Sequence, residues 1–241
     1  MSDEIEITRD GGILRIGLKR PEQGNALTPA MTAAITDAVT KVDAETRVIV
    51  LTAEGNDFCT GRVAAMPKPG TQATANDLRA MISDPVLDFY DVLRNAPVPV
   101  LARVQGKAAG VGCALAALAD VAVAADNAVF VVPEMNHDIA PTLVMDALCD
   151  RVSRATLARL VLTRDPVSAT EALEMGVIGK VVPDSELDAE VERLAAQLAK
   201  NSASTVRAIK AFLICAPESS HATRKELAAL LNATATAEKF R

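Results

Sequence analysis

Short apolar runs recur along the first three quarters of the chain, separated by turn residues or by helix-like stretches. Runs of this length that are bounded by glycine, proline or asparagine predict β-strands. The first two runs flank Gly11-Gly12, a combination that predicts a β-hairpin. The predicted strands cover residues 5–8, 13–18, 48–52, 98–104, 121–124, 129–132 and 178–182.

Stretches with helical periodicity lie between these runs. Thr28 and Pro29 supply an N-cap and a proline at the first helical position. Ser168 and Glu171 have the spacing of a capping box, and Pro85 is expected to kink or restart its helix. Helices are predicted over residues 29–42, 77–95, 142–161 and 169–176, with a helix of small residues that ends near residue 119.

The order of the elements changes near residue 184. Before that point, strands, turns and helices alternate, which predicts an α/β fold with helices packed on sheets. Residues 185–241 are helical in pattern and contain no predicted strand. We therefore expect an α/β core over residues 1–184 and a helical C-terminal region over residues 185–241. Residues 63–75 are rich in proline and glycine and predict an irregular loop.

The composition sets limits on the class of protein. A length of 241 residues fits one large domain, or one domain with a helical appendage. Half of the residues are hydrophobic but only 2% are aromatic, so the core must consist mainly of Ala, Val, Leu and Ile. The net charge of -6 argues against nucleic acid as a partner, because binding to nucleic acid depends on neutralising phosphates.

The cysteines and the N-terminus indicate where the protein works. Four widely spaced cysteines and two histidines make a zinc site improbable, so we expect no metal. No apolar stretch is long enough to span a membrane without charges, and the first ten residues lack a secretion signal. We expect a soluble cytoplasmic protein that binds no membrane and keeps its thiols reduced.

Three segments that each follow an apolar run carry the candidate chemistry. They are Phe58–Arg62, Gln105–Gly112 and Pro133-Glu134. Two glycine-containing turns that expose backbone N–H groups, together with one carboxylate, suit a reaction on a carbonyl whose oxygen gains negative charge. Each segment alone also has an ordinary interpretation, as a strand–loop connection, as close helix packing or as a solvated glutamate.

Taken together and in order, these segments resemble the crotonase family, the enoyl-CoA hydratases and isomerases. The resemblance covers roughly residues 10 to 215. Its motifs are Arg20-Pro21-Glu22-Gln23-Gly24-Asn25-Ala26-Leu27, Phe58-Cys59-Thr60-Gly61, Gln105–Gly112, Leu115-Ala116, Ala119-Asp120, Pro133-Glu134, Ala169, Glu171-Ala172, Met175-Gly176 and Val181-Val182-Pro183.

The resemblance implies a spiral of ββα units, a helical C-terminal region, and a homotrimer or hexamer. It also implies an acyl-CoA substrate whose thioester oxygen lies between two backbone N–H groups, here those of Arg62 and Val111. Each such donor contributes about 2.7–4 kcal/mol in the transition state. Glu134 is the matching acid/base, and no separate cofactor is implied because coenzyme A is part of the substrate. The resemblance also implies six residues that bind the substrate or its coenzyme A, namely Thr60, Gly61, Ala64, Gly110, His137 and Asp138.

One departure from the family pattern bears on the reaction. Hydratases of this family use two glutamates, and the first would fall at Ala114. A single carboxylate at Glu134 can remove a proton beside the thioester and return it further along the chain, which is double-bond isomerisation. The alternatives are hydration with His137 or Asp138 as the second group, hydrolysis, decarboxylation, or a catalytically silent acyl-CoA-binding protein. We favour a structural role for Asp138, as a substitute for glycine in left-handed backbone.

Further departures lie near the expected site. Val63 replaces the family's usual aspartate, and Thr142-Leu143-Val144 replaces a glycine pair expected after Pro141. The C-terminus also stops short of the family's closing helix motif. Because coenzyme A is strongly anionic and the chain is acidic, local cations must bind it. The candidates are Arg62, Lys68, Lys19 and Arg20, each of which has an equally good interpretation as a solvated surface charge.

Overall fold

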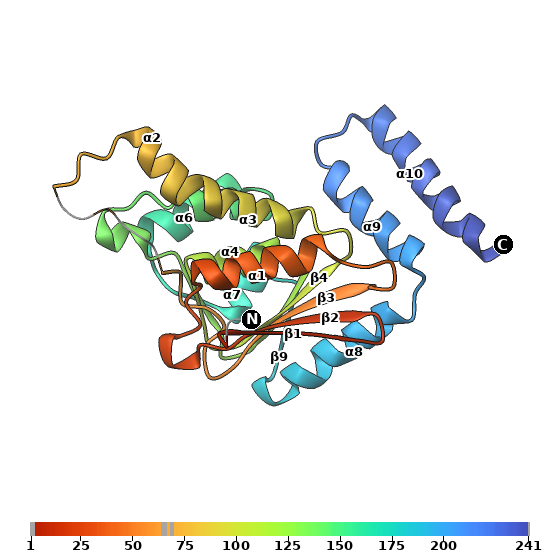
Figure 1. The fold of residues 1–241 in the computed structure, drawn as a ribbon, viewed down its shortest axis with the longest axis horizontal. Helices are drawn as coiled ribbons and strands as arrows, with labels where there is room; N and C mark the ends of the chain where they lie inside the picture. The colour runs from red at the N-terminus through yellow and green to blue at the C-terminus, as the bar shows by residue number, and fades with distance from the viewer. Residues whose placement is uncertain (1–2, 64–66, 68–69, 241) are drawn as a thin grey trace.

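The computed structural model describes residues 3–63, 67 and 70–240. Figure 1 shows a twisted sheet with helices on both faces, and a pair of C-terminal helices that extends beyond it. The described part of the chain contains no helix that is both long and apolar enough to cross a membrane. The candidate site residue Ala64 and the candidate cation Lys68 lie outside the described residues.

The larger sheet has six strands in the order β1-β2-β3-β4-β6-β9. β1 and β2 pair antiparallel as the predicted hairpin, with positive φ at Gly11 and Gly12, and the other neighbours pair in parallel. The strands are β1 (Ile5–Asp10), β2 (Ile13–Leu18), β3 (Val48–Ala53), β4 (Val100–Val104), β6 (Val121–Ala125) and β9 (Lys180–Val182), and each confirms a predicted strand.

Helices bury the two faces of this sheet in separate apolar clusters. α1 (Pro29–Thr40), α3 (Asp84–Arg94) and α4 (Val111–Leu118) lie on one face, and α8 (Leu187–Ala199) lies on the other (Figure 1). Every residue of α4 is buried, because its small side chains let neighbouring elements approach closely. The remaining helices of the core are α5 (Thr142–Cys149), α6 (Arg154–Thr163), α7 (Ala169–Met175) and the short 3₁₀ helices η1 (Pro21–Gln23), η3 (Glu134–His137) and η4 (Asp184–Glu186).

A second, three-stranded sheet consists of β5 (Lys107–Ala109), β7 (Val129–Val131) and β8 (Val167–Ser168), in that order. The prediction of strand at residues 129–132 is confirmed, whereas β5 and β8 were not predicted. β5 was missed because it lies between Gly106 and Gly110, both with positive φ, in a segment expected to be a turn leading into a helix. This sheet matters for function, because β5 leads directly into α4.

The predicted helix that contains Pro85 is confirmed with a change of winding. α2 (Ala75–Leu78) is followed by the π-helical turn η2 (Arg79–Ser83) and then by α3. Proline has no N–H and its ring excludes a normal preceding turn, so the wider turn lies immediately before it. The predicted loop over residues 63–75 ends at Thr74, the N-cap of α2. Residues 142–161 are mostly helical, as predicted, and form α5 and α6 with a break between Cys149 and Arg154.

The C-terminal region is helical, as predicted, and has two kinds of packing. α8 buries Leu187, Val191 and Ala195 against the strands of the larger sheet. α9 (Ala203–Cys215) and α10 (His221–Ala237) pack on each other beyond the sheet (Figure 1), and the chain continues into η5 (Glu238–Phe240). The division into two domains near Asp184 stays a prediction, and by its packing α8 belongs with the sheet.

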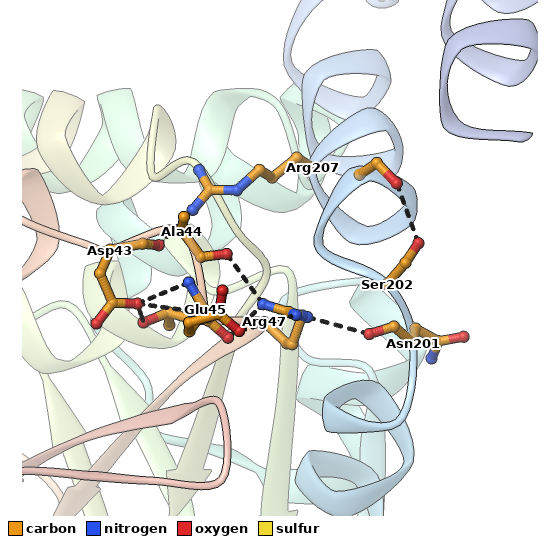
Figure 2. A network of polar contacts seen from close by, with 9 residues as sticks. Asp43, Ala44, Glu45, Arg47, Asn201, Ser202 and Arg207 are labelled. Atoms are coloured by element: carbon orange, nitrogen blue, oxygen red, sulfur yellow. Dashed lines mark hydrogen bonds and ion pairs between the residues drawn. The ribbon is translucent and has the colours of Figure 1, made fainter. Parts of the chain in front are cut away.

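Polar side chains join α9 to the core. Arg47, at the start of β3, donates to the carbonyl of Asn201 at 3.1 Å, and Arg207 donates to the carbonyl of Asp43 at 2.6 Å (Figure 2). One turn further along α9, Lys210 Nζ lies 2.9 Å from Asp120 Oδ2 and is only 2% exposed. These contacts hold the C-terminal helices to the loop before β3 and to the end of α4.

Candidate active site

The entry segment before α1 holds the first turn in place. Asn25 is fully buried, and its Nδ2 donates to the carbonyls of Glu54 and Asp57, each at 2.8 Å. Thr60 donates through its hydroxyl to the carbonyl of Gly24 at 3.0 Å. Thr60 therefore helps to fix the turn and does not line the cavity described below.

The first and second turns are paired directly. Cys59 N donates to the carbonyl of Lys107 at 3.2 Å, and Ala109 N donates to the carbonyl of Cys59 at 2.9 Å. A Cβ at Gly112 would lie 1.9 Å from the same Cys59 carbonyl oxygen, so only glycine permits this approach. This pairing brings the residues that follow the two segments, Arg62 and Val111, to one cavity.

Both candidate N–H donors are left without a partner. The bridge between Leu27 and Arg62 uses the Gly61 carbonyl, at 3.0 Å from Leu27 N, and the Val63 N–H. The Arg62 N–H is therefore not part of that pairing. Val111 is the first residue of α4, where N–H groups have no helical acceptor. Neither N–H has a hydrogen-bond partner within the described part of the chain.

All three predicted catalytic residues, Arg62, Val111 and Glu134, line a cavity of about 360 Å³. This volume lies in the range of about 300–1,000 Å³ typical of small-molecule sites. Among the predicted residues, Gly61, Arg62, Val111 and Glu134 line it. Thr60, Gly110, His137 and Asp138 do not, and Ala64 lies outside the described residues. Its other lining residues are Leu78, Ile82, Ser83, Ile139, Ala140, Thr142 and Leu143.

Glu134 begins η3, directly behind the end of β7. Its Oε1 lies against Gly110, where an added Cβ would come within 2.6 Å of it, so Gly110 shapes the site although it does not line the cavity. Its Oε2 is buried and has no hydrogen-bond partner among the described residues. Burial raises the pKa of Glu134, against the opposing effects of its own backbone N–H and of the Arg62 charge. A carboxyl group with these properties is suited to act as a general base.

None of the three positions considered for a second acid/base group places such a group in the cavity. Ala114, the position at which the resemblance implies a glutamate in hydratases, is fully buried in α4. His137 and Asp138 are exposed at the end of η3 and do not line the cavity. Asp138 has φ 56°, which confirms the expectation that it substitutes for glycine in left-handed backbone.

The sequence did not reveal several residues of the site. Leu78 reaches the cavity from the end of α2, and Ile82 and Ser83 reach it from the π-helical turn before Pro85. Tyr90 of α3 is fully buried, and its hydroxyl has no partner among the described residues. Burial raises the pKa of Tyr90, and the charges of Arg62 and Glu134 also act on it, so this hydroxyl lies near the site. Side chains that arrive from a helix through tertiary packing carry no local sequence motif.

The candidate cations differ in their partners. Lys19 pairs with Glu54 at 3.2 Å, and Arg20 pairs with Glu4 at 3.0 Å. Arg62 lines the cavity and forms no ion pair with any described residue. Of the three described candidates, it is therefore the one best placed to meet a ligand.

Comparisons with known proteins identify the family of the chain. The family model described as enoyl-CoA hydratase/isomerase matches residues 8–240. The mouse protein "Enoyl-CoA hydratase domain-containing protein 3, mitochondrial" is 36% identical over 202 residues, which are 83% of this chain and 66% of the relative. The chain thus spans slightly less than two thirds of that relative's length.

Solved structures agree with this assignment. The human enoyl-CoA hydratase domain-containing protein 3 superposes with a TM-score of 0.87 at 30% identity, covering 96% of this chain and 91% of that chain. A putative enoyl-CoA hydratase from Thermobifida fusca, solved in complex with CoA, gives 0.84 at 28% identity, covering 98% and 93%. The expected crotonase fold is confirmed, and the chain belongs to the enoyl-CoA hydratase/isomerase family of the crotonase superfamily.

Proposed function

We propose that the cavity binds an acyl-CoA thioester and that Glu134 isomerises a 3-enoyl to a 2-enoyl thioester. Glu134 removes a proton from carbon 2, and the electrons move to the thioester oxygen. The N–H groups of Arg62 and Val111 stabilise the resulting enolate. Glu134 then returns the proton to carbon 4, which leaves the double bond between carbons 2 and 3. The proton is carried within one site, so a single carboxylate is sufficient.

One observation carries this proposal. Glu134 is the only carboxylate among the described residues that line the cavity, and it shares that cavity with Arg62 and Val111. Burial is the main cause of its raised pKa, and a raised pKa makes a carboxylate a stronger base. Hydration is less well supported because it needs a second group to deliver or accept a proton. Ala114 supplies none, and His137 and Asp138 are exposed outside the cavity.

A purified sample with 3-enoyl-CoA in deuterated water, followed by proton NMR, tests the reaction. We expect the 2-enoyl thioester to appear with deuterium exchange, and Glu134→Gln to reduce the rate about 10²–10⁴-fold. Glu174→Gln removes an exposed glutamate on α7 and is the matched control. Formation of the 3-hydroxy product would favour hydration. An unchanged spectrum despite binding of the thioester would favour a silent acyl-CoA-binding protein.

The same proposal includes an assembly and a cellular location. Exposed apolar side chains on the C-terminal helices, namely Ile209, Leu213, Leu230 and Phe240, support a homotrimer or hexamer. Light scattering after gel filtration would give the mass directly, and a monomer at micromolar concentration would contradict this assembly. We further propose that the reaction needs no cofactor besides the coenzyme A of the substrate. A cytoplasmic location remains a proposal, and the mouse relative is named as mitochondrial.

A further inference from the structure

The side chain of Arg62 is a charge without a counterpart. Arg62 is a lining residue of the cavity, and its charge acts on both Glu134 and Tyr90. No described carboxylate forms an ion pair with it. Glu134 lies close enough for the Arg62 charge to lower its pKa, but the two groups are not in ion-pair contact. The two other described candidate cations differ in this respect, since Lys19 and Arg20 both have glutamate partners.

The rest of the cavity wall has few polar groups that could stabilise the charge of this guanidinium. Leu78, Ile82, Ile139 and Leu143 make most of it apolar, and the described polar groups besides Glu134 are the hydroxyls of Ser83 and Thr142. Arg62 is half-buried, and a ligand that fills the cavity would shield its charge further from water, which is costly unless an anion pairs with it. Guanidinium and carboxylate form the strongest such pair, because two parallel hydrogen bonds can join them.

We propose that Arg62 binds a carboxylate at the far end of the acyl group, so that the preferred ligands are coenzyme A thioesters of short dicarboxylic acids. This inference rests on the proposed function, because it assumes that the thioester oxygen meets the N–H of the same residue. One residue then contacts both ends of the acyl group. The reach of a single arginine side chain limits the distance between those ends, so the diacid is short.

The phosphates of coenzyme A are a second possible source of anionic charge. Three features of the site favour the acyl carboxylate. Arg62 shares its cavity with Glu134 and Val111, the groups assigned to the reacting end of the thioester. The phosphates lie at the opposite end of the pantetheine arm from the thioester. The apolar wall also suits the carbon chain of an acyl group better than a nucleotide.

Equilibrium binding of matched thioesters tests the assignment. Succinyl-, glutaryl- and adipoyl-CoA are compared with butyryl-, pentanoyl- and hexanoyl-CoA, which have the same numbers of carbon atoms but end in a methyl group. Free coenzyme A is measured alongside. We expect wild-type protein to bind at least one diacid thioester about tenfold more tightly than its neutral counterpart. In Arg62→Met this preference falls below about twofold, and in Arg62→Lys part of it returns.

Arg224→Met removes an arginine from α10 and should keep the wild-type preference. Circular dichroism establishes that each variant is folded. Equal binding of both members of every pair by wild-type protein would overturn the inference but leave an acyl-CoA site intact. An equal loss for diacid esters, neutral esters and free coenzyme A in Arg62→Met would assign the guanidinium to the phosphates. If no thioester binds at all, the proposed function fails, and this inference fails with it.

Discussion

Two regions of the molecule differ in whether their buried polar groups have partners, namely the candidate active site and the place where the C-terminal helices attach to the core. In the site, Glu134 Oε2 and the Tyr90 hydroxyl are buried without a hydrogen-bond partner among the described residues. At the attachment, Lys210 lies against both oxygens of Asp120, at 3.0 and 2.9 Å. Unsatisfied polar groups reduce stability, whereas satisfied ones specify how elements meet. The comparison indicates that the site keeps polar groups available for a ligand at a cost in stability.

The largest loss of stability is expected from a substitution at Gly112, where the backbones of the two turns lie in contact. In Gly112→Ala the new Cβ would lie 1.9 Å from the Cys59 carbonyl oxygen, which cannot move without breaking the pairing of the two turns. We expect a loss of roughly 4 kcal/mol or more, or failure to fold. Urea denaturation measures this loss, with Gly17→Ala as the control, because the nearest atom that a Cβ there would meet is Thr52 Oγ1, at an ordinary contact distance of 3.5 Å. Equal stability of the two variants would show that the second turn can shift.

The next largest loss of stability is expected from breaking the ion pair of Lys210 with Asp120, which attaches α9 to the core. Lys210→Met leaves the Asp120 carboxylate, whose side chain is only 13% exposed, without its cation, which we expect to cost about 3–5 kcal/mol. Lys180→Met is the control, because the Lys180 side chain is 45% exposed in its pair with Glu190, and such pairs contribute less than about 1 kcal/mol. Thermal unfolding of both variants decides the point. Similar small losses would mean that the buried pair contributes no more than a surface pair.

The two regions also differ in how far the sequence predicts them. The turns were predictable because glycines at 61, 110 and 112 and the carboxylate at 134 occupy fixed places next to apolar runs. The capping residues Thr28 and Ser168 likewise predicted the starts of α1 and α7. These features are local, so a single sequence carries them.

The rest depends on contacts between distant segments. β5 and β8 form only because they flank β7, and their own sequences are too short to predict a strand. Tyr90 approaches the site from α3, some forty residues before Glu134, and nothing in its neighbourhood indicates this. The partners of Lys210 and Arg207 are likewise more than 80 residues away along the chain. Tertiary packing determines such contacts, and the local sequence pattern does not predict them.

A smaller effect of opposite sign is expected at Tyr90. Tyr90→Phe removes a buried hydroxyl that has no described partner and keeps the ring, so we expect a gain of about 1 kcal/mol. Thr60→Val is the matched control, because the Thr60 hydroxyl donates to the Gly24 carbonyl and its removal should lower stability. Urea denaturation compares the two. A loss of stability in Tyr90→Phe would show that its hydroxyl is satisfied, for example by an internal water molecule.

The smallest expected effect belongs to Glu134 and depends on pH. Burial raises the folded-state pKa of this carboxyl above its value in the unfolded chain. The folded state therefore holds the proton to higher pH, and wild-type stability falls as pH rises from the unfolded pKa through the folded one. Glu134→Gln removes this titration. The variant should be more stable than wild type above that window and lose the advantage below it, while the isomerisation that we propose should be slower at every pH.

Unfolding midpoints of both proteins between pH 3 and pH 8 would show the difference vanish at low pH, and Glu174→Gln should run parallel to wild type because that side chain is exposed. The gain is small because Glu134 is only partly buried and the Arg62 charge already stabilises its ionised form. A constant difference between Glu134→Gln and wild type across this range would mean that the carboxyl has an ordinary pKa. The contrast between the two regions would then rest on Tyr90 alone. A difference that grows with pH would instead place the cost of the site in the same carboxylate to which we assign the proton transfer.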